Sequence, residues 1–171
     1  MHKEPWLTIR KDKCEMPNGT IIPAFYVNEY PDWVNAFAIT KDGKAVMVKQ
    51  YRHGIGEESI ELPGGVVDEG ETFQQGAARE MLEETGYVFE KYEYLGKICA
   101  NPSTTNNFMH MYLATGGEKV AEQDLDHSEE IEVMLMTIDE VKQLLKENKI
   151  MQSLHANCIF YALAKLEEMK Y

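Results

Sequence analysis

Residues 65–87, GVVDEGETFQQGAAREMLEETGY, are the most informative part of this chain. Five residues separate Gly65 from Glu71, and seven more separate Glu71 from Arg79. The stretch then ends in charged and small residues, namely Glu80, Glu83, Glu84 and Gly86. Carboxylates at these spacings around one arginine predict a cation site suited to cleaving a diphosphate.

The second half of this stretch has the pattern of a helix from about Thr72 to Thr85. Thr72 and Gln75, three positions apart, are predicted to form a capping box at its start. Gly86 stands where a helix stop is expected, because glycine adopts the left-handed conformation that ends many helices. A helix would therefore carry the glutamates.

Glu80, Glu83 and Glu84 share one stripe of this helix at about 100° per residue, and the opposite side is expected to face a core. We place Ala78, Met81 and Leu82 on that core side. The like charges of the stripe repel one another, so a bound cation would make them easier to tolerate. Hard oxygen ligands suit Mg²⁺, with Mn²⁺ as the alternative. The competing interpretation of the helix alone is a solvated acidic face.

Strands are predicted on both sides of this helix. They cover 6–10, 20–27, 34–40, 45–51 and 59–62 before it, and 92–100, 108–114 and 131–137 after it. An Asp-Gly pair at 42–43 is a strong hairpin signal. Two helices, at 138–147 and 151–170, follow by pattern. The order predicts one α+β (mixed α/β) domain over residues 1–171 rather than a regular βαβ repeat.

The composition of the chain excludes several kinds of partner. The formal charge of −12 argues against a nucleic-acid polymer, because such binding needs a basic patch. No stretch approaches the length of an apolar membrane span, and the N-terminus lacks the apolar segment of a secretory signal. The three separated cysteines, Cys14, Cys99 and Cys158, indicate reduced thiols. We therefore expect a cytoplasmic protein without a membrane partner.

Residues 65–87 resemble the Nudix hydrolase signature, which runs glycine, five residues, glutamate, seven residues, then Arg-Glu-apolar-x-Glu-Glu-x-Gly-apolar. All seven fixed positions match, and Met81 and Tyr87 occupy the two apolar slots. The resemblance implies an α/β/α sandwich fold. It also implies metal-dependent hydrolysis of a nucleoside diphosphate linked to another moiety.

The same resemblance assigns roles to residues of the signature. It implies that Glu80 and Glu84 ligate the metal, that Glu83 lies near it, and that the backbone carbonyl of Gly64 is a further ligand. Glu83 and Glu84 are also candidates for catalysis. Arg79 would act as a structural orienter rather than as a catalyst, holding a carboxylate through a bidentate pair.

Residues outside the signature resemble the branch that hydrolyses ADP-ribose and nucleoside diphosphate sugars. There a strand ends in Gln-Tyr-Arg before a Glu-Leu-Pro segment, as at 50–52 and 61–63 here. The resemblance implies that Arg52 contacts the phosphates and that Glu61 lies in the active site. Pro102, sixteen residues after Gly86, also fits this branch, and Pro102 with Ser103 is expected to line the sugar end. Residues 103–107, STTNN, depart from the Ser-Pro-Gly and acidic pair that are usual in this branch. The sequence therefore does not identify which nucleoside diphosphate sugar is the substrate.

A base outside the helix would need a further carboxylate or a histidine. The branch places a glutamate just before an apolar-Glu-Val strand, and Glu129 is the match, with Glu130 next. His127 could take this role by its chemistry, and so could a glutamate of the signature. Trp33 is a candidate for stacking on the nucleotide base, although burial in a core is the commoner fate of such a residue.

The sequence therefore predicts hydrolysis of ADP-ribose or another nucleoside diphosphate sugar to a nucleoside monophosphate and a sugar phosphate. Two alternatives remain at this point. One is a Nudix hydrolase for dinucleoside polyphosphates or coenzyme A derivatives, and the other is a sensor that binds a nucleotide sugar without cleaving it. The branch commonly forms homodimers through N-terminal strands, so residues 1–30 would be the dimerisation arm.

Overall fold

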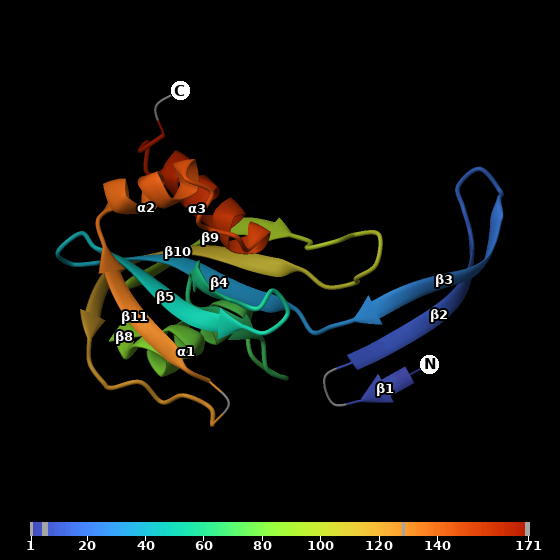
Figure 1. Ribbon diagram of the computed structural model, residues 1–171, viewed down its shortest axis with the longest axis horizontal. Helices are drawn as coiled ribbons and strands as arrows, with labels where there is room; N and C mark the ends of the chain where they lie inside the picture. The colour runs from blue at the N-terminus through green and yellow to red at the C-terminus, as the bar shows by residue number, and fades with distance from the viewer. Residues whose placement is uncertain (1, 5–6, 128, 170–171) are drawn as a thin grey trace.

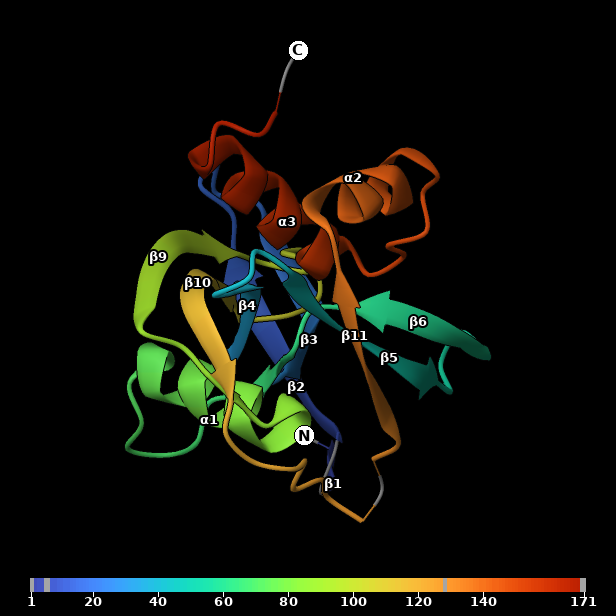
Figure 2. The same cartoon turned by 90° about the vertical axis from the view of Figure 1, so that its left-hand side faces the viewer.

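The computed structural model describes residues 2–4, 7–127 and 129–169 of the chain. A mixed β-sheet forms the centre of the body, with helices on both of its faces, and an N-terminal hairpin projects from one end (Figures 1 and 2). The expected α/β/α sandwich with an N-terminal antiparallel region is confirmed. Residue 6, the expected start of the first strand, and residue 170, the expected end of the last helix, lie outside the described residues.

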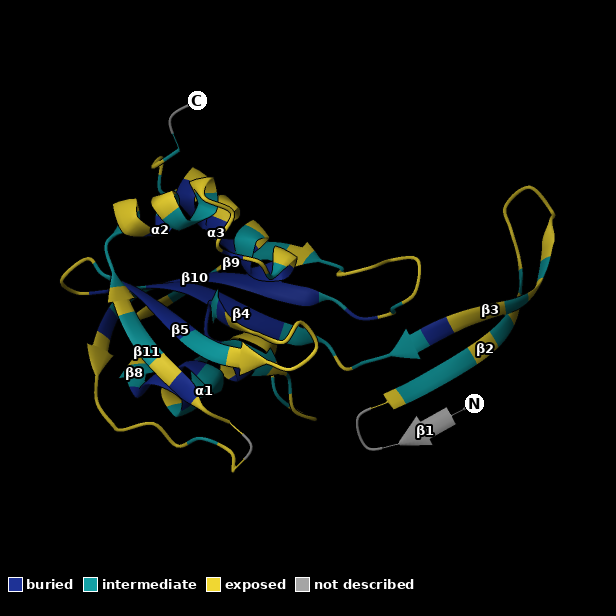
Figure 3. Ribbon diagram, viewed as in Figure 1, coloured by how far each residue is buried: buried dark blue, intermediate teal, exposed yellow. Residues whose placement is uncertain are grey.

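The large sheet has eight strands. They are β4 (Trp33–Thr40), β5 (Ala45–Arg52), β6 (Glu57–Glu61), β7 (Gly64–Val66), β8 (Tyr87–Val88), β9 (Lys91–Ile98), β10 (Met109–Lys119) and β11 (Ile131–Met136). The path β11-β5-β4-β10-β8 forms its centre, with β6 beside β5, β7 beside β4 and β9 beside β10. Only β4 and β10 pair in parallel among the described strands, and both are almost completely buried (Figure 3).

Helix α1 (Phe73–Thr85) covers one face of the sheet, and α2 (Ile138–Lys146) and α3 (Ser153–Lys165) cover the other. The alternation along β4 supplies both cores, because successive side chains of a strand point to opposite faces. Val34 and Ala36 pack with Met81 of α1, whereas Phe37 packs with Ile159 of α3. No helix in the described part of the chain is long and apolar enough to cross a membrane.

The caps of α1 agree with the sequence, but its inner face is rotated from the expected one. Thr72 and Gln75 form the capping box, as predicted. Met81 is fully buried, whereas Leu82 is exposed and Ala78 is only half-buried, so the expected core side was partly wrong. The inner stripe instead follows i, i+4 and i+8, which are Ala77, Met81 and Thr85.

The N-terminal hairpin pairs β2 (Leu7–Glu15) with β3 (Ile21–Glu29), and β1 (His2–Glu4) lies beside β2. We call these strands the arm. The loop at 101–107 supports its base, because Asn28 N–H donates to Thr104 O at 2.7 Å and Tyr30 N–H donates to Asn106 Oδ1 at 3.0 Å. The outer part of the hairpin extends away from the body (Figure 1).

The C-terminus of α1 is joined tightly to the loop that follows β10. Gly86 adopts a left-handed conformation with φ of 74°, and its N–H donates to Leu82 O at 2.8 Å. Its carbonyl accepts from Val120 N–H and Ala121 N–H. A Cβ on Gly86 would lie 2.1 Å from Ala121 O, so both conformation and space require glycine here.

Gly86→Ala should destabilise the protein more than Gly43→Ala does. Both residues have positive φ, but a Cβ on Gly43 would meet nothing within 4 Å. The control should therefore carry only the conformational cost, about 1 kcal/mol, and Gly86→Ala should lose at least about 1 kcal/mol more through the clash. Urea unfolding followed by circular dichroism measures both, and equal losses would contradict the close approach to Ala121.

Candidate active site

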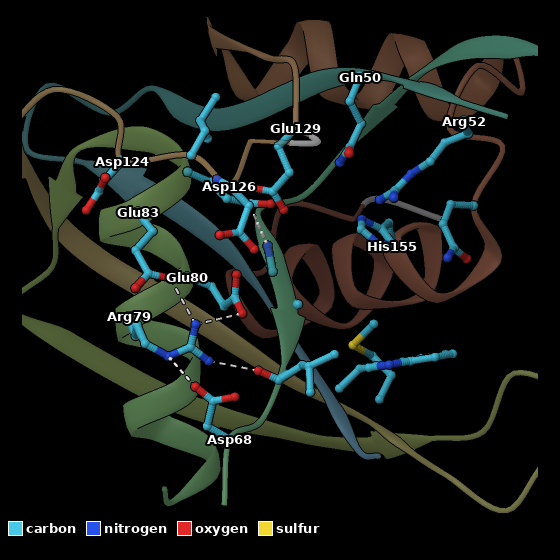
Figure 4. Close-up of a pocket in the computed structure, with 18 residues that line it drawn as sticks. Gln50, Arg52, Asp68, Arg79, Glu80, Glu83, Asp124, Asp126, Glu129 and His155 are labelled. Carbon is cyan, nitrogen blue, oxygen red and sulfur yellow. Dashed lines mark hydrogen bonds and ion pairs between the residues drawn. The ribbon is translucent and has the colours of Figure 1, made fainter. Parts of the chain in front are cut away.

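A cavity of about 960 Å³ opens beside α1 and is lined by residues of β5, β7 and the first turn of α3 (Figure 4). Its size suits a small organic ligand. Nine residues that the sequence singled out line it: Trp33, Arg52, Gly64, Gly65, Arg79, Glu80, Glu83, Glu84 and Glu129. Glu61, Pro102 and Ser103 are not among the described residues that line it.

The Arg79 guanidinium organises the acidic wall of this cavity. It forms a bidentate pair with Glu71, with Nε–Oε1 at 2.9 Å and Nη2–Oε2 at 3.1 Å. Its Nη1 donates to both Glu80 Oε1 and Glu83 Oε2 at 2.9 Å, and its Nη2 donates to Val66 O at 2.8 Å. The bidentate partner is thus Glu71 rather than Glu80. The orienting role predicted for Arg79 agrees with this geometry.

Burial dominates the electrostatics of the two glutamates behind Arg79. It raises the pKa of Glu80 to about 6, although the Arg79 charge pulls in the opposite direction. It raises the pKa of Glu84 to about 8, and the Gly64 N–H, which donates to Glu84 Oε2 at 2.9 Å, offsets only part of this. The side chains that should carry negative charge are therefore held where water stabilises that charge poorly.

Two consecutive glycines, Gly64 and Gly65, let β7 lie against α1 and β4 at distances that leave no room for a side chain. A Cβ on Gly65 would lie 2.5 Å from Glu80 Oε1. Gly64 has φ of +153°, and a Cβ there would lie 2.2 Å from Val34 O. Any larger residue at either position would displace the carboxylate or the strand, which gives the first glycine of the signature a steric reason.

The residues present fit a divalent cation by their donor chemistry. Glu80, Glu83 and Glu84 all line the cavity, two of them have pKa values raised by burial, and a nearby cation would offset that cost. Within the described ranges, no three His, Cys, Asp or Glu side chains are already gathered as a metal cage. Arg79 pairs with Glu80 and Glu83 instead, so binding would require these carboxylates to share or exchange that partner.

Arg52 faces the acidic wall from the end of β5 (Figure 4). Glu61 holds it with a second bidentate pair, Nε–Oε1 at 3.0 Å and Nη2–Oε2 at 2.6 Å. Burial alone would raise the pKa of Glu61, but the hydrogen bonds from Arg52 and the nearby positive charge outweigh it, and the pKa is lowered. Glu61 thus acts on the cavity through Arg52, since its own carboxylate is 1% exposed.

The loop after β10 brings Glu129 to the cavity and is fastened to α1. Asp124 N–H donates to Glu83 O at 2.8 Å, and Gln123 Nε2 donates to Glu84 O at 2.7 Å. The exposed Glu129 accepts from Asp126 N–H at 3.0 Å. The alternatives Glu130 and His127 are exposed and are not among the described residues that line the cavity.

The residues expected at the base and sugar ends of the substrate differ in position. Trp33 is half-buried at the cavity, with its ring 5.5 Å from that of Tyr30. Pro102 and Ser103 are exposed on the loop that supports the arm, so their contact with substrate stays a prediction.

Several cavity residues were missed from the sequence: Gln50, Asp68, Asp124, Asp126, Gln152 and His155. Asp124 and Asp126 had a visible signal, because they belong to the acidic run before the strand at 131–136. Gln152 and His155 had none, because they reach the cavity only through the packing of α3 against the sheet. Glu71 was matched as a fixed position of the signature without a role, and the structure makes it the anchor of Arg79.

Comparison with known proteins agrees with this fold. Residues 30–158 match the NUDIX domain, and residues 1–28 match the nucleoside diphosphate sugar hydrolase N-terminal domain. The chain is 35% identical over 146 residues to a methanol dehydrogenase activator of Bacillus methanolicus, covering 85% of this chain and 78% of the relative. It is 31% identical over 155 residues to an ADP-ribose pyrophosphatase of Bacillus subtilis (strain 168), covering 90% and 83%.

A solved structure described as an ADP compounds hydrolase has the same fold. It superposes with a TM-score of 0.85 at 19% identity, covering 98% of this chain and 90% of that one. The fold, the signature at residues 65–87 and the relatives together define a hydrolase that acts on diphosphate bonds. The chain belongs to the Nudix family.

Metal-free Glu84→Gln protein should lose part of the pH dependence of stability that wild type shows. The folded pKa of Glu84, about 8, exceeds the ordinary value of 4.5 for a glutamate, so the folded state holds the extra proton between these values. Stability of the metal-free wild type should therefore fall as pH rises through that window. The variant should melt higher than wild type at pH 8, by about 2–4 °C per kcal/mol recovered.

Thermal unfolding in a chelator at pH 5 and pH 8 measures this difference. Glu69→Gln, which removes an exposed carboxylate, is the control and should follow wild type. Added Mg²⁺ should raise the melting temperature of wild type at pH 8 more than that of Glu84→Gln. An identical pH dependence in wild type and Glu84→Gln would mean that the burial of this carboxylate does not cause the loss of stability at high pH.

Proposed function

We propose that the protein hydrolyses the diphosphate linkage of ADP-ribose or another nucleoside diphosphate sugar, giving a nucleoside monophosphate and a sugar phosphate. The observation that carries this proposal is the cavity in which the carboxylates ordered by Arg79 face the guanidinium of Arg52. An anionic diphosphate can bridge such walls only if cations lie on the acidic side. The N-terminal domain match and the relative named ADP-ribose pyrophosphatase support the sugar-linked class.

Each residue of the site has a role in this reaction. Arg52, held by Glu61, donates to phosphoryl oxygens and stabilises the charge that develops on them. Glu80, Glu84 and the Gly64 carbonyl would hold Mg²⁺, or Mn²⁺, with Glu83 beside them. A divalent ion at this site supplies charge neutralisation and makes a bound water more acidic. Glu129 accepts the proton of the attacking water, and Glu83 and Glu84 are the alternatives.

Other parts of the substrate have candidate contacts at the edges of the site. Trp33 would stack on the nucleotide base, because it presents a half-buried ring to the cavity. Pro102 and Ser103 would approach the sugar end. The alternative substrates are dinucleoside polyphosphates and coenzyme A derivatives, and a nucleotide-sugar sensor is the alternative in another class.

Purified protein with Mg²⁺ should release nucleoside monophosphate fastest from ADP-ribose or another nucleoside diphosphate sugar. The panel should also contain a dinucleoside polyphosphate and a coenzyme A derivative, each tested with Mg²⁺ and with Mn²⁺. Glu80→Gln and Glu84→Gln should lower kcat by about 10²-fold or more, because each removes charge from the site. Glu69→Gln, outside the cavity, should retain activity.

Two results of this panel would contradict the proposal. Full Mg²⁺-dependent turnover by Glu84→Gln would show that the Glu84 carboxylate is not needed for hydrolysis. Tight binding of ADP-ribose without turnover in either metal would favour the sensor.

We also infer that the protein works as a homodimer joined through the arm of residues 1–30. The support is physical, because a sheet of two or three strands without a packed face is marginally stable, and this arm exposes Ile21, Phe25 and Tyr26. Phe25 and Tyr26 are successive and point to opposite faces of the arm, so a second copy that encloses β3 from both sides would bury these side chains.

Light scattering should give twice the chain mass of 19.6 kDa for wild type. Phe25→Glu should shift the protein towards monomer, because it puts a charge on the arm surface that the partner would cover. Phe160→Glu on α3 places the same charge on an exposed aromatic away from the arm and should leave the mass unchanged. A monomeric wild type would remove the arm from any role in assembly.

We place the protein in the cytoplasm and treat residues 1–171 as one functional unit, a Nudix domain with its arm. The cysteines support this location, because Cys14, Cys99 and Cys158 are all free thiols.

A further inference from the structure

His155 is a buried histidine that connects α3 to the cavity, and the roles above do not use it. It is 4% exposed, lines the cavity, and lies in the first turn of α3. Figure 4 shows its ring next to Arg52 and across the cavity from the acidic wall. It comes from the layer of helices on the opposite side of the sheet from α1.

The hydrogen bonding of the ring defines its tautomer. Nδ1 accepts a buried hydrogen bond from Leu62 N–H at 2.8 Å, so the neutral ring carries its proton on Nε2. Nε2 lies 3.8 Å from Glu61 Oε2, too far for a hydrogen bond but close enough for the N–H dipole to face the carboxylate. The ring therefore contacts two consecutive residues, Glu61 through its side chain and Leu62 through its backbone.

The segment that His155 holds connects the two walls of the site. At its start, the Glu61 carboxylate grips Arg52 in a bidentate pair. At its end, Gly64 N–H donates to Glu84 Oε2 on the acidic wall. Between them, Leu62 follows the end of β6, and its N–H donates its hydrogen bond to the His155 ring of α3. A shift of Leu62 would thus move Arg52 and Gly64 together.

We propose that His155 is a positioning residue, which fixes segment 61–64 through its bond to Leu62 N–H and so holds Arg52 at the phosphate-binding wall. This inference rests on the proposed function, because that function gives Arg52 its contact with the diphosphate. His155 then contributes to turnover without touching the reacting atoms. The competing explanation is a core histidine that contributes only to stability.

A double-mutant cycle between His155 and Arg52 separates these explanations. Arg52→Lys keeps the positive charge opposite the buried Glu61 but loses the planar fork, so it spares the fold better than Arg52→Ala. With ADP-ribose and Mg²⁺, His155→Ala and Arg52→Lys should each lower kcat/KM by about 10–100-fold, with the same division between kcat and KM. In the Arg52→Lys background, His155→Ala should cost less than about threefold, because the two residues act through one contact.

Substitutions that imitate one ring nitrogen identify the contact that matters. His155→Asn places an acceptor oxygen where Nδ1 lies and should recover most of the activity lost in His155→Ala. His155→Gln reaches the position of Nε2 and should recover less. Ile159→Ala, a fully buried substitution on the same helix, is the control for destabilisation alone and should leave kcat/KM unchanged below its melting temperature.

Each outcome of these measurements bears on a different claim. If wild type hydrolysed none of the diphosphates tested, the proposed function itself would be refuted. Turnover by wild type with unchanged kcat/KM in Arg52→Lys and His155→Ala would overturn the positioning role while leaving the hydrolase in place. Additive losses in the cycle, no advantage of His155→Asn over His155→Ala, or an equal loss in Ile159→Ala would each overturn it as well.

Discussion

The hydrogen bonds of the Arg79 guanidinium hold the acidic side of the site in place. One planar group joins the first part of the signature, through Glu71, to the carboxylates of α1 and to the backbone of β7 at Val66. Lysine could not make these contacts, since it lacks the rigid fork of donors that serves several oxygens at once. The pairing also keeps like charges close together on one helix, where they would otherwise repel.

Across the cavity, a second arginine is held in the same way by a different element. Glu61 pairs with Arg52 as Glu71 pairs with Arg79, but Glu61 is inaccessible to solvent, so its charge is compensated by the Arg52 guanidinium and faces the ring of His155. The two arrangements involve different helical layers, because Arg79 belongs to α1 and Glu61 lies beside His155 of α3. The candidate site therefore depends on both helical layers.

Local patterns were enough to predict the three helices, the longer strands and the acidic wall, but not the short strands β1, β7 and β8. The capping box of Thr72 and the helix stop at Gly86 depend on residues a few positions apart, so the chain itself carries that information. The contribution of α3 could not be predicted, because no sequence spacing relates His155 to Leu62, ninety-three residues earlier. The exposure of Leu82 was missed for a related reason, since the rotation of α1 is set by what packs beneath it.

The parallel pairing of β4 with β10 has a consequence for the order in which the site forms. These strands face each other in register from Trp33 with Met109 onwards, so the chain between them must close a long loop before the pair gains any contact. Contacts so distant in sequence slow folding. As the chain leaves the ribosome, the signature helix emerges before α3. The cavity beside this helix is complete only after α3 has emerged and docked on the sheet. Catalytic competence is thus among the last properties that this chain acquires.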